Sequence, residues 1–217
     1  MKDNYIMNVL LTGGAGYIGS HVALSLLDLN HKVFIIDDLS TGNEYLIPKN
    51  AEFIKSNIND IKKIELILKK NKFDAVMHFA GFVQVEESVQ FPEKYFINNT
   101  ENSIKLFEVC IKNNLKNIIF SSTAAIYGNC NKENFISENS QINPINPYGE
   151  SKYKTENFLL KQNKKINFII LRYFNVAGAD PKLRSGLVSK KATHLIKIAS
   201  EVVAGKREKI TIYGNDY

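Results

Sequence analysis

The stretch NVLLTGGAGYIGSH, residues 8–21, decides how the rest of this sequence is interpreted. It opens with a short apolar run, as expected of a strand that is buried on both faces. Four glycines follow at once, and helical periodicity begins among them: Gly13, Gly14, Gly16 and Gly19. A strand, a glycine-rich turn and a helix in this order are typical of a dinucleotide-binding fold, because glycine permits the tight turn and lets a pyrophosphate approach bare backbone. The helix N-terminus then offers free N–H groups to the phosphates.

An acidic residue ends the next apolar run. Asp37 closes the segment KVFIID, eighteen residues after Gly19. An acid at this place in a dinucleotide-binding fold accepts hydrogen bonds from the adenosine ribose and repels the 2′-phosphate of NADP. We therefore expect the cofactor to be NAD. The alternative is that Asp37, which Asp38 follows directly, is only a solvated acid that opens a turn.

Apolar runs alternate with helical segments along most of the chain. The runs that predict strands are 8–12, 32–37, 51–56, 74–80, 116–122 and 167–175. The segments that predict helices are 17–30, 60–71, 92–114 and 148–162. This alternation favours an α/β fold with a doubly wound parallel sheet. We expect an NAD-binding Rossmann domain over 1–175 and, over 176–217, the start of a smaller substrate domain with one helix (192–204) and one strand (209–213).

Composition excludes several classes of protein. The net charge is +6 over 217 residues, but the lysines are spread along the chain without the aromatic interleaving of a nucleic-acid site. No stretch approaches the ~20 apolar residues of a membrane span. The apolar run near residue 8 is too short, and its glycines come too early, for a secretory signal, so we expect none in this segment. Two thiols, Cys110 and Cys130, suggest a reducing, cytoplasmic setting and give no metal-ligand spacing.

A tyrosine and a lysine lie four residues apart in NPYGESK, residues 146–152. On a helix, Tyr148 and Lys152 would share one face. A neighbouring cation favours the phenolate and lowers the pKa of a phenol from about 10. A tyrosine in this position is a candidate general base for a sugar or alcohol hydroxyl. The alternative is an amphipathic pair that covers a helix face.

Polar groups also follow other predicted strands. HFAGF (78–82), SSTAAIYG (121–128) and RYFNVAGA (172–179) each leave the carboxyl end of a strand. Ligands bind at the carboxyl ends of the strands in a doubly wound sheet. We therefore expect these groups to line the same crevice as Tyr148 and Lys152.

The motifs TGGAGYIG, SSTAAIYG, PYGESK and RYFN resemble the extended short-chain dehydrogenase/reductase family. HFAG, LRYFNVAGA and IYGNDY are similar to segments of the UDP-glucose 4-epimerases within that family, and the resemblance extends over essentially the whole chain. It implies NAD-dependent interconversion of UDP-glucose and UDP-galactose, by reversible hydride transfer at sugar C4 through a 4-keto intermediate. Preference between these sugars and N-acetylated UDP-sugars does not follow from the sequence.

The resemblance also implies roles for single residues. Tyr148 would remove the proton of the 4-hydroxyl, Lys152 would hold the nicotinamide ribose and keep Tyr148 acidic, and Thr123 would align the same hydroxyl. The substrate would contact Thr123, Tyr148, Asn175, His194, Leu195, Thr211 and Tyr213. The cofactor would contact Gly13, Gly14, Gly16, Tyr17, Ile18, Gly19, Asp37, Asp38, Asn57, Ile58, Phe79, Ala80, Gly81, Asn98, Ser121, Tyr148, Lys152 and Tyr173. No metal is implied.

The sequence departs from the family pattern at three places. Val83 stands where many epimerases carry a lysine for the cofactor phosphates, and Asn57 stands where an acid is common. Both changes suggest a lower NAD affinity. Such epimerases continue well past IYGNDY, so we expect 176–217 to be a truncated nucleotide-sugar-binding domain.

Alternative functions remain open. A nucleotide-sugar 4,6-dehydratase would need an acid/base pair after the threonine, and Ala124 and Ala125 have no proton to give. Another NAD-dependent epimerase or reductase of the family, or a truncated non-catalytic NAD-binding module, would share the same cofactor motifs. The resemblance further implies a homodimer through the helices predicted at 92–114 and 148–162.

Overall fold

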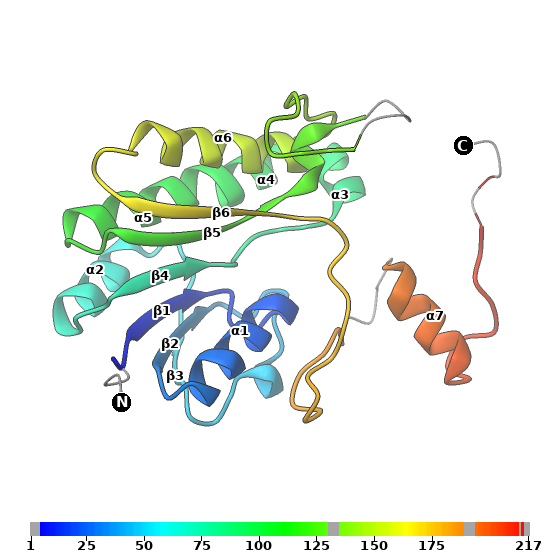
Figure 1. Cartoon of the computed structure of the whole chain (residues 1–217), viewed down its shortest axis with the longest axis horizontal. Coiled ribbons are helices and arrows are strands. Elements are labelled where there is room, and N and C mark those ends of the chain that lie inside the picture. Colours follow the sequence, from blue (N-terminus) through cyan, green and yellow to red (C-terminus); the bar gives the residue numbers. More distant parts are fainter. Residues whose placement is uncertain (1–4, 130–134, 189–193, 213, 215–217) are drawn as a thin grey trace. The chain divides into compact units, whose positions relative to one another are not determined.

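A six-stranded parallel sheet forms the centre of Met1–Phe174, the first of two units into which the computed structural model divides the chain (Figure 1). The second unit is Asn175–Tyr217. The structure describes residues 5–129, 135–188, 194–212 and 214. The strand order is β3-β2-β1-β4-β5-β6, so the chain first winds outward from β1 on one side and then returns to wind outward on the other. The predicted doubly wound parallel sheet is confirmed.

Strands and helical elements alternate along the chain, and in two places, between β4 and β5 and between β5 and β6, several helical elements follow one another. The strands are β1 (Asn8–Thr12), β2 (Lys32–Asp37), β3 (Glu52–Lys55), β4 (Ala75–His78), β5 (Asn117–Thr123) and β6 (Asn167–Tyr173). The helices are α1 (Tyr17–Asp28), η1 (Glu44–Leu46), α2 (Ile61–Lys70), α3 (Val85–Gln90), α4 (Pro92–Tyr95), η2 (Phe96–Asn102), α5 (Ser103–Lys112), η3 (Ala124–Tyr127), α6 (Pro147–Lys161) and α7 (Leu195–Val203).

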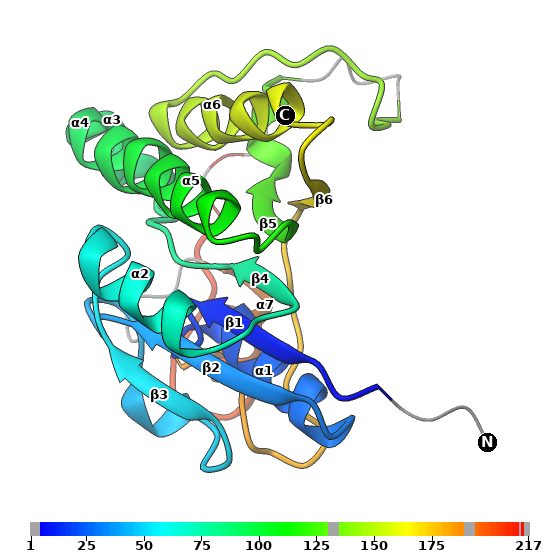
Figure 2. The ribbon, with the colours of Figure 1, turned by 90° about the vertical axis from the view of Figure 1, so that its left-hand side faces the viewer.

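The core has two layers because successive side chains of a strand point to opposite faces of the sheet. Leu10 and Ile36 belong to the cluster that packs against α2, α5 and α6. Their neighbours Leu11 and Ile35 belong to the cluster that packs against α1. In Figure 2, α2 and α5 lie on one side of the sheet and α1 on the other. Burial on both faces explains why the strands read as continuous apolar runs.

The single helix predicted over 92–114 is wrong in detail. Phe96–Asn102 is a π-helical segment between two α-helical ones, and α3 before it was not predicted. Hydroxyls bind the backbone at the widened turn: Thr155 of α6 donates to the carbonyl oxygen of Asn99 at 2.8 Å. Thr100 donates to the carbonyl oxygen of Ser151 at 2.8 Å. A π turn of this kind is frequent at functional sites, and it depends on a neighbouring helix that local periodicity does not reveal.

In the second unit, α7 occupies most of the helix predicted over 192–204, of which 192 and 193 lie outside the described residues. The strand predicted over 209–213 is wrong for 209–212, which are irregular, and 213 is not described. A strand needs a neighbour to bond its N–H and C=O groups. Among the described residues of this unit, none forms such a partner strand. Cys110 is buried in α5, and Cys130 lies outside the described residues.

Candidate active site

The glycine turn between β1 and α1 is shaped by two close approaches. Gly13 has φ +73°, and a Cβ there would lie 2.4 Å from the backbone nitrogen of Ala80. A Cβ at Gly19 would lie 2.2 Å from the carbonyl oxygen of Gly13. At Gly14 a Cβ would collide with Ile35. These three glycines therefore serve the packing of the turn against β2, β4 and its own helix.

Gly16 differs from the other three glycines. It is the N-cap of α1 in an ordinary extended conformation, and as a glycine it has no side chain to cap the helix. A Cβ at Gly16 would meet only the carbonyl oxygen of Gly13, at 3.2 Å. Tyr17 and Ile18 follow, both half-buried. The N-terminus of α1, with the positive end of its dipole, thus lies beside a residue without a side chain, where an anion could approach the backbone.

Asp37 ends β2 beside this turn and is almost completely buried. Its Oδ2 accepts from the backbone N–H of Ala15 at 3.0 Å, and its Oδ1 accepts from that of Leu39 at 2.9 Å. Burial raises the pKa of its carboxyl, against the effect of these two hydrogen bonds. Each carboxylate oxygen keeps a lone pair for a further donor, so Asp37 can fix the turn and still accept a ribose hydroxyl.

Asn57 lies next to the second acid of this pair. Its Nδ2 donates to Asp38 Oδ2 at 2.5 Å, and its Oδ1 accepts from the backbone N–H of Asn59. Burial alone would raise the pKa of Asp38, but hydrogen bonds from Ser40 and Asn57 lower it. A carboxylate at 57 could not donate to Asp38 and would repel it. The amide therefore suits a site in which two acids already follow one another. Ile58 is buried.

The segment after β4 is held by an asparagine that sequence reasoning did not single out. Asn99 accepts from the backbone N–H of Phe82 at 2.9 Å and donates to the Phe82 carbonyl oxygen, also at 2.9 Å. A Cβ on Gly81 would lie 3.1 Å from Lys152 Nζ and 3.2 Å from Asn99 Oδ1. Asn98, the predicted residue, is half-buried and donates to Asn99 Oδ1. The adjacent Asn–Asn pair was the available signal, but the π turn that buries the second one was not visible in the sequence.

Helix α6 brings Tyr148 and Lys152 to the carboxyl end of β5. Asn146 caps the helix by accepting from the Gly149 N–H at 2.8 Å. The side chain of Thr123 lies beside Tyr148 and acts to lower the pKa of its phenol. Lys152, only 3% exposed, donates from Nζ to the carbonyl oxygen of Ser121 at 2.9 Å. The structure thus gathers the predicted Thr123, Tyr148 and Lys152 at one place.

The expected lowering of the Tyr148 pKa is not found. Burial raises the pKa of Tyr148, and the side chain of Thr123 only partly opposes this. Burial also lowers the pKa of Lys152 to about 8, against the attraction of Glu156. The sequence showed that both side chains share a helix face, but it did not show that the ammonium is directed to the Ser121 carbonyl.

The remaining predicted cofactor residues lie at the same sheet edge. Phe79 donates its N–H to the Thr12 carbonyl oxygen at 3.0 Å and is followed by Ala80. Tyr173 ends β6 as the register partner of Thr123, and burial raises the pKa of its phenol. Predicted residues therefore lie at or just beyond the carboxyl ends of all six strands, with Asn57 and Ile58 following β3.

Most predicted contacts to the uridine diphosphate lie in the second unit. Asn175, Leu195 and Thr211 are exposed, and His194 immediately precedes α7. Tyr213 lies outside the described residues. Each of the two units is described by itself, so the substrate-binding roles of these residues stay predictions. Among the described residues, no cluster of three or more metal-binding side chains is present, and no helix is both long and apolar enough to cross a membrane.

Comparison with known proteins supports the sequence resemblance. A family model described as "NAD dependent epimerase/dehydratase family" matches residues 9–216. A UDP-glucose 4-epimerase of Azospirillum brasilense is 44% identical over 211 residues, which cover 96% of this chain and 60% of that protein. A Brucella ovis UDP-glucose 4-epimerase solved in complex with NAD superposes with a TM-score of 0.91, at 37% identity over 97% of this chain and 65% of that one.

A third comparison concerns a structure that holds a nucleotide besides the cofactor. The Bifidobacterium longum UDP-glucose 4-epimerase, in complex with NAD+ and UDP, superposes with a TM-score of 0.87. It is 32% identical over 97% of this chain and 66% of that one. The chain therefore spans just under two thirds of the length of these relatives.

Proposed function

The chain belongs to the NAD dependent epimerase/dehydratase family, and from that premise we propose that it binds NAD and interconverts UDP-glucose and UDP-galactose. The observation that carries the proposal is that the Thr123 side chain acts on the phenol of Tyr148 beside the buried Lys152, whose Nζ donates to the Ser121 carbonyl oxygen. Nothing in the packing of a nucleotide-binding sheet requires these three side chains together at a strand end. A hydroxyl, a phenol and an ammonium are the groups that proton transfer to and from a sugar hydroxyl needs.

The described residues fit NAD. The N-terminus of α1 and the bare Gly16 would receive the pyrophosphate, and Asp37 would receive the adenosine ribose. Its charge, with that of Asp38 beside it, disfavours the 2′-phosphate of NADP. We assign 1–175 as the NAD-binding domain and 176–217 as the beginning of a nucleotide-sugar-binding domain.

Each residue of the catalytic set has one task in the proposed reaction. Tyr148 exchanges a proton with the sugar 4-hydroxyl, and Thr123 holds that hydroxyl in line with the phenol. Lys152 would donate to the nicotinamide ribose in addition to the Ser121 carbonyl oxygen. Bound NAD+ would supply reversible hydride transfer at the sugar C4 and a positive charge that favours the Tyr148 phenolate.

The raised pKa of Tyr148 defines the resting state of the ligand-free site. The phenol keeps its proton at neutral pH, so it is ready to donate to the 4-keto oxygen. Removal of a proton from the substrate needs the phenolate, which the charges of Lys152 and of the bound cofactor favour. The cofactor therefore has an electrostatic part in the proposal as well as a redox part.

The test is to purify the chain, measure bound NAD(H) by absorbance and fluorescence, and assay UDP-glucose formation from UDP-galactose. We expect bound NAD and turnover, with Tyr148→Phe retaining NAD and losing at least 10³-fold in kcat, an order of magnitude consistent with loss of an acid/base group. Bound NAD without turnover by the unsubstituted chain would favour the non-catalytic NAD-binding module. Absence of NAD binding would overturn the proposal.

A homodimer through the 92–114 and 148–162 helices is part of the proposal. Ile97 and Leu160 on these segments are 42% and 46% exposed. Apolar side chains that are exposed on neighbouring helices suit a helix–helix interface. Light scattering on the purified chain measures the mass of the assembly directly.

A further inference from the structure

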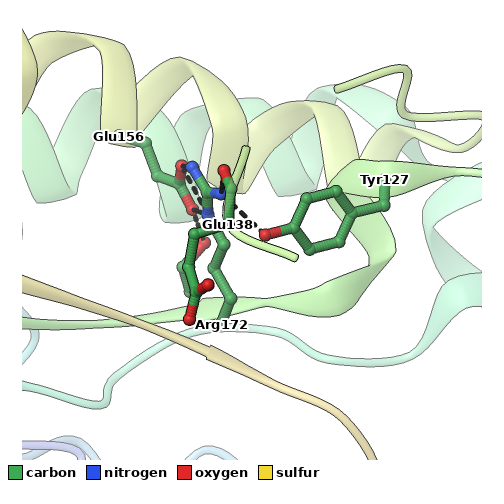
Figure 3. Close-up of polar contacts among 5 residues, drawn as sticks. Tyr127, Glu138, Glu156 and Arg172 are labelled. Carbon is green, nitrogen blue, oxygen red and sulfur yellow. Dashed lines mark hydrogen bonds and ion pairs between the residues drawn. The ribbon is translucent and has the colours of Figure 1, made fainter. Parts of the chain in front are cut away.

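A buried carboxylate lies one helical turn beyond Lys152. Glu156 of α6 has no exposed surface and accepts from three donors (Figure 3). Arg172 Nη2 donates to its Oε2 at 2.8 Å, and Arg172 Nε lies 3.3 Å from both of its oxygens. Ser122 Oγ donates to its Oε1. Arg172 Nη1 also donates to Tyr127 OH at 2.7 Å. We refer to Ser122, Tyr127, Glu156 and Arg172 as the Glu156 cluster.

The register of β5 with β6 and the residue spacing on α6 bring side chains of four elements together in the Glu156 cluster. Ser122 of β5 and Arg172 of β6 are direct partners in the parallel pairing, so their side chains lie on one face of the sheet. Glu156 follows Tyr148 and Lys152 at intervals of four on α6, so the three share one helix face. Tyr127 comes from η3, which begins directly after Thr123. A charge on the buried face of α6 was the sequence signal for this cluster.

The attachment of α6 to the sheet does not by itself explain why an ion pair is buried between them. Burying two charges is costly, and apolar replacements of similar volume are often equally stable or more stable. Phe120 and Leu159, both fully buried, already attach α6 to the sheet without polar groups. Unlike apolar contacts, the hydrogen bonds of the Glu156 carboxylate are directional, because a fork-shaped guanidinium and a hydroxyl fix its orientation. The cluster therefore sets the alignment of α6 against β5 and β6.

That alignment controls both contacts of the candidate active site. Ser122 lies between Ser121, whose carbonyl oxygen accepts from Lys152, and Thr123, which lies beside Tyr148. A shift of β5 along α6 would disturb both contacts at once. We propose that Glu156 is a positioning residue: through Ser122 and Arg172 it holds the end of β5 so that Thr123 and the Ser121 carbonyl meet Tyr148 and Lys152.

The inference rests on the proposed function for its meaning in catalysis, but its geometry can be tested without a ligand. The Glu156 carboxylate also attracts the Lys152 ammonium and opposes the effect of burial on that amine. Loss of Glu156 should therefore change the surroundings of Lys152 in two ways, through position and through charge. The ¹³Cε resonance of Lys152, assigned with a Lys152→Arg variant, reports both in the ligand-free chain.

Three variants separate positioning from stability. Glu156→Gln keeps the shape and removes the charge, and Ser122→Ala removes only the contact to β5. The double variant Glu156→Met with Arg172→Met replaces the ion pair by apolar groups and should regain much of the stability lost in Glu156→Gln. Glu150→Gln is the matched control, because Glu150 is on the same helix in an exposed pair with Lys154.

We expect all variants except the control to shift the Lys152 resonance away from its position in the unsubstituted chain. We also expect them to lower kcat at least tenfold, with KM changed less than threefold and NAD content within twofold. If the double variant regains both the stability and the original Lys152 resonance, the cluster is only structural and the inference is wrong. If Glu156→Gln does not fold, Ser122→Ala and the double variant decide.

Failure of the proposed role of Glu156 and failure of the proposed function would give different results. An unsubstituted chain without NAD binding or turnover would overturn that function, while the comparison of Lys152 resonances would remain valid. An unchanged resonance in Ser122→Ala and in the double variant would overturn the role of Glu156 even if the unsubstituted chain turns over UDP-galactose.

Discussion

At the scale of single residues, the glycines of the β1–α1 turn have different tasks. Gly13 and Gly19 are required by backbone that lies closer than any Cβ could. Gly16 has an ordinary backbone conformation and only one neighbour at 3.2 Å. Its lack of a side chain therefore serves something that approaches from outside the fold, which in the proposed function is the pyrophosphate of NAD.

Alanine substitutions should separate these tasks. Gly16→Ala should leave the free energy of unfolding within about 1 kcal/mol of the unsubstituted value and lower NAD affinity at least tenfold. Gly19→Ala should cost about 2–4 kcal/mol, because its Cβ would lie 2.2 Å from the Gly13 carbonyl oxygen. Urea unfolding and NAD titration measure the two effects. Equal NAD affinity in Gly16→Ala would contradict the assigned phosphate site.

Because of Lys152, the free energy of unfolding of the ligand-free chain should vary with pH in the alkaline range. Burial lowers its pKa from 10.5 to about 8, so the unfolded chain binds the proton more tightly than the folded one. Charged Lys152 is therefore unfavourable to folding below pH 8, and this penalty disappears as pH rises from about 8 to 10.5. Relative to Lys152→Met, the unsubstituted chain should gain up to about 1.4 kcal/mol per pH unit in this window.

Urea unfolding of both proteins at several pH values measures this difference. Comparing them removes the contributions of the other titrating groups. A difference between the two free energies of unfolding that stays constant from pH 7 to 10 would show that Lys152 is not held in a desolvated site.

At the scale of elements, the π-helical segment η2 joins the loop after β4 to α6. Asn99 makes two hydrogen bonds to the backbone of Phe82, one as donor and one as acceptor. Thr155 donates to the backbone carbonyl oxygen of Asn99. The turn therefore positions the Gly81 backbone close to Lys152. An ordinary α-helical turn would place these groups in a different register.

Asn99→Asp tests this arrangement with little change of shape. A carboxylate can accept from the Phe82 N–H but cannot donate to the Phe82 carbonyl oxygen, which would then face a charged acceptor. We expect a loss of about 1–3 kcal/mol in the free energy of unfolding. Asn98→Ala, at the half-buried neighbour, should lose less than about 1 kcal/mol. Equal losses in the two variants would mean that the pairing with Phe82 does not determine the turn.

Sequence reasoning succeeded where the pattern is local and failed where partners come from afar. The buried strands follow from continuous apolar runs, and the shared helix face of Tyr148 and Lys152 follows from the 3.6-residue period of a helix. The π turn and the task of Asn99 depend on hydroxyls of α6. The direction of the Lys152 ammonium depends on the Ser121 carbonyl. Local spacing contains none of these contacts, so the sequence named the right face of α6 but gave the wrong direction for the Tyr148 pKa.

At the scale of the whole molecule, the two units differ in how much core they contain. The central strands of Met1–Phe174 are buried on both faces, and residues such as Leu10, Leu11 and Val76 have almost no exposed surface. In α7 of the second unit, all of whose residues are described, none is buried. Leu195 and Val203 are 65% and 90% exposed. A helix without a buried apolar face gains little from tertiary packing.

Amide hydrogen exchange should therefore divide the chain unequally. Amides of β1, β4 and β5 should exchange only through global unfolding, whereas those of Leu195–Val203 should exchange at least 10³-fold faster, because opening this helix exposes little apolar surface. Exchange followed by mass spectrometry on the 217-residue chain measures both groups in one experiment, with α1 as an internal reference that packs on the sheet. Protection of α7 equal to that of α1 would show that residues 195–203 unfold together with the sheet, and that the second unit is energetically part of the first.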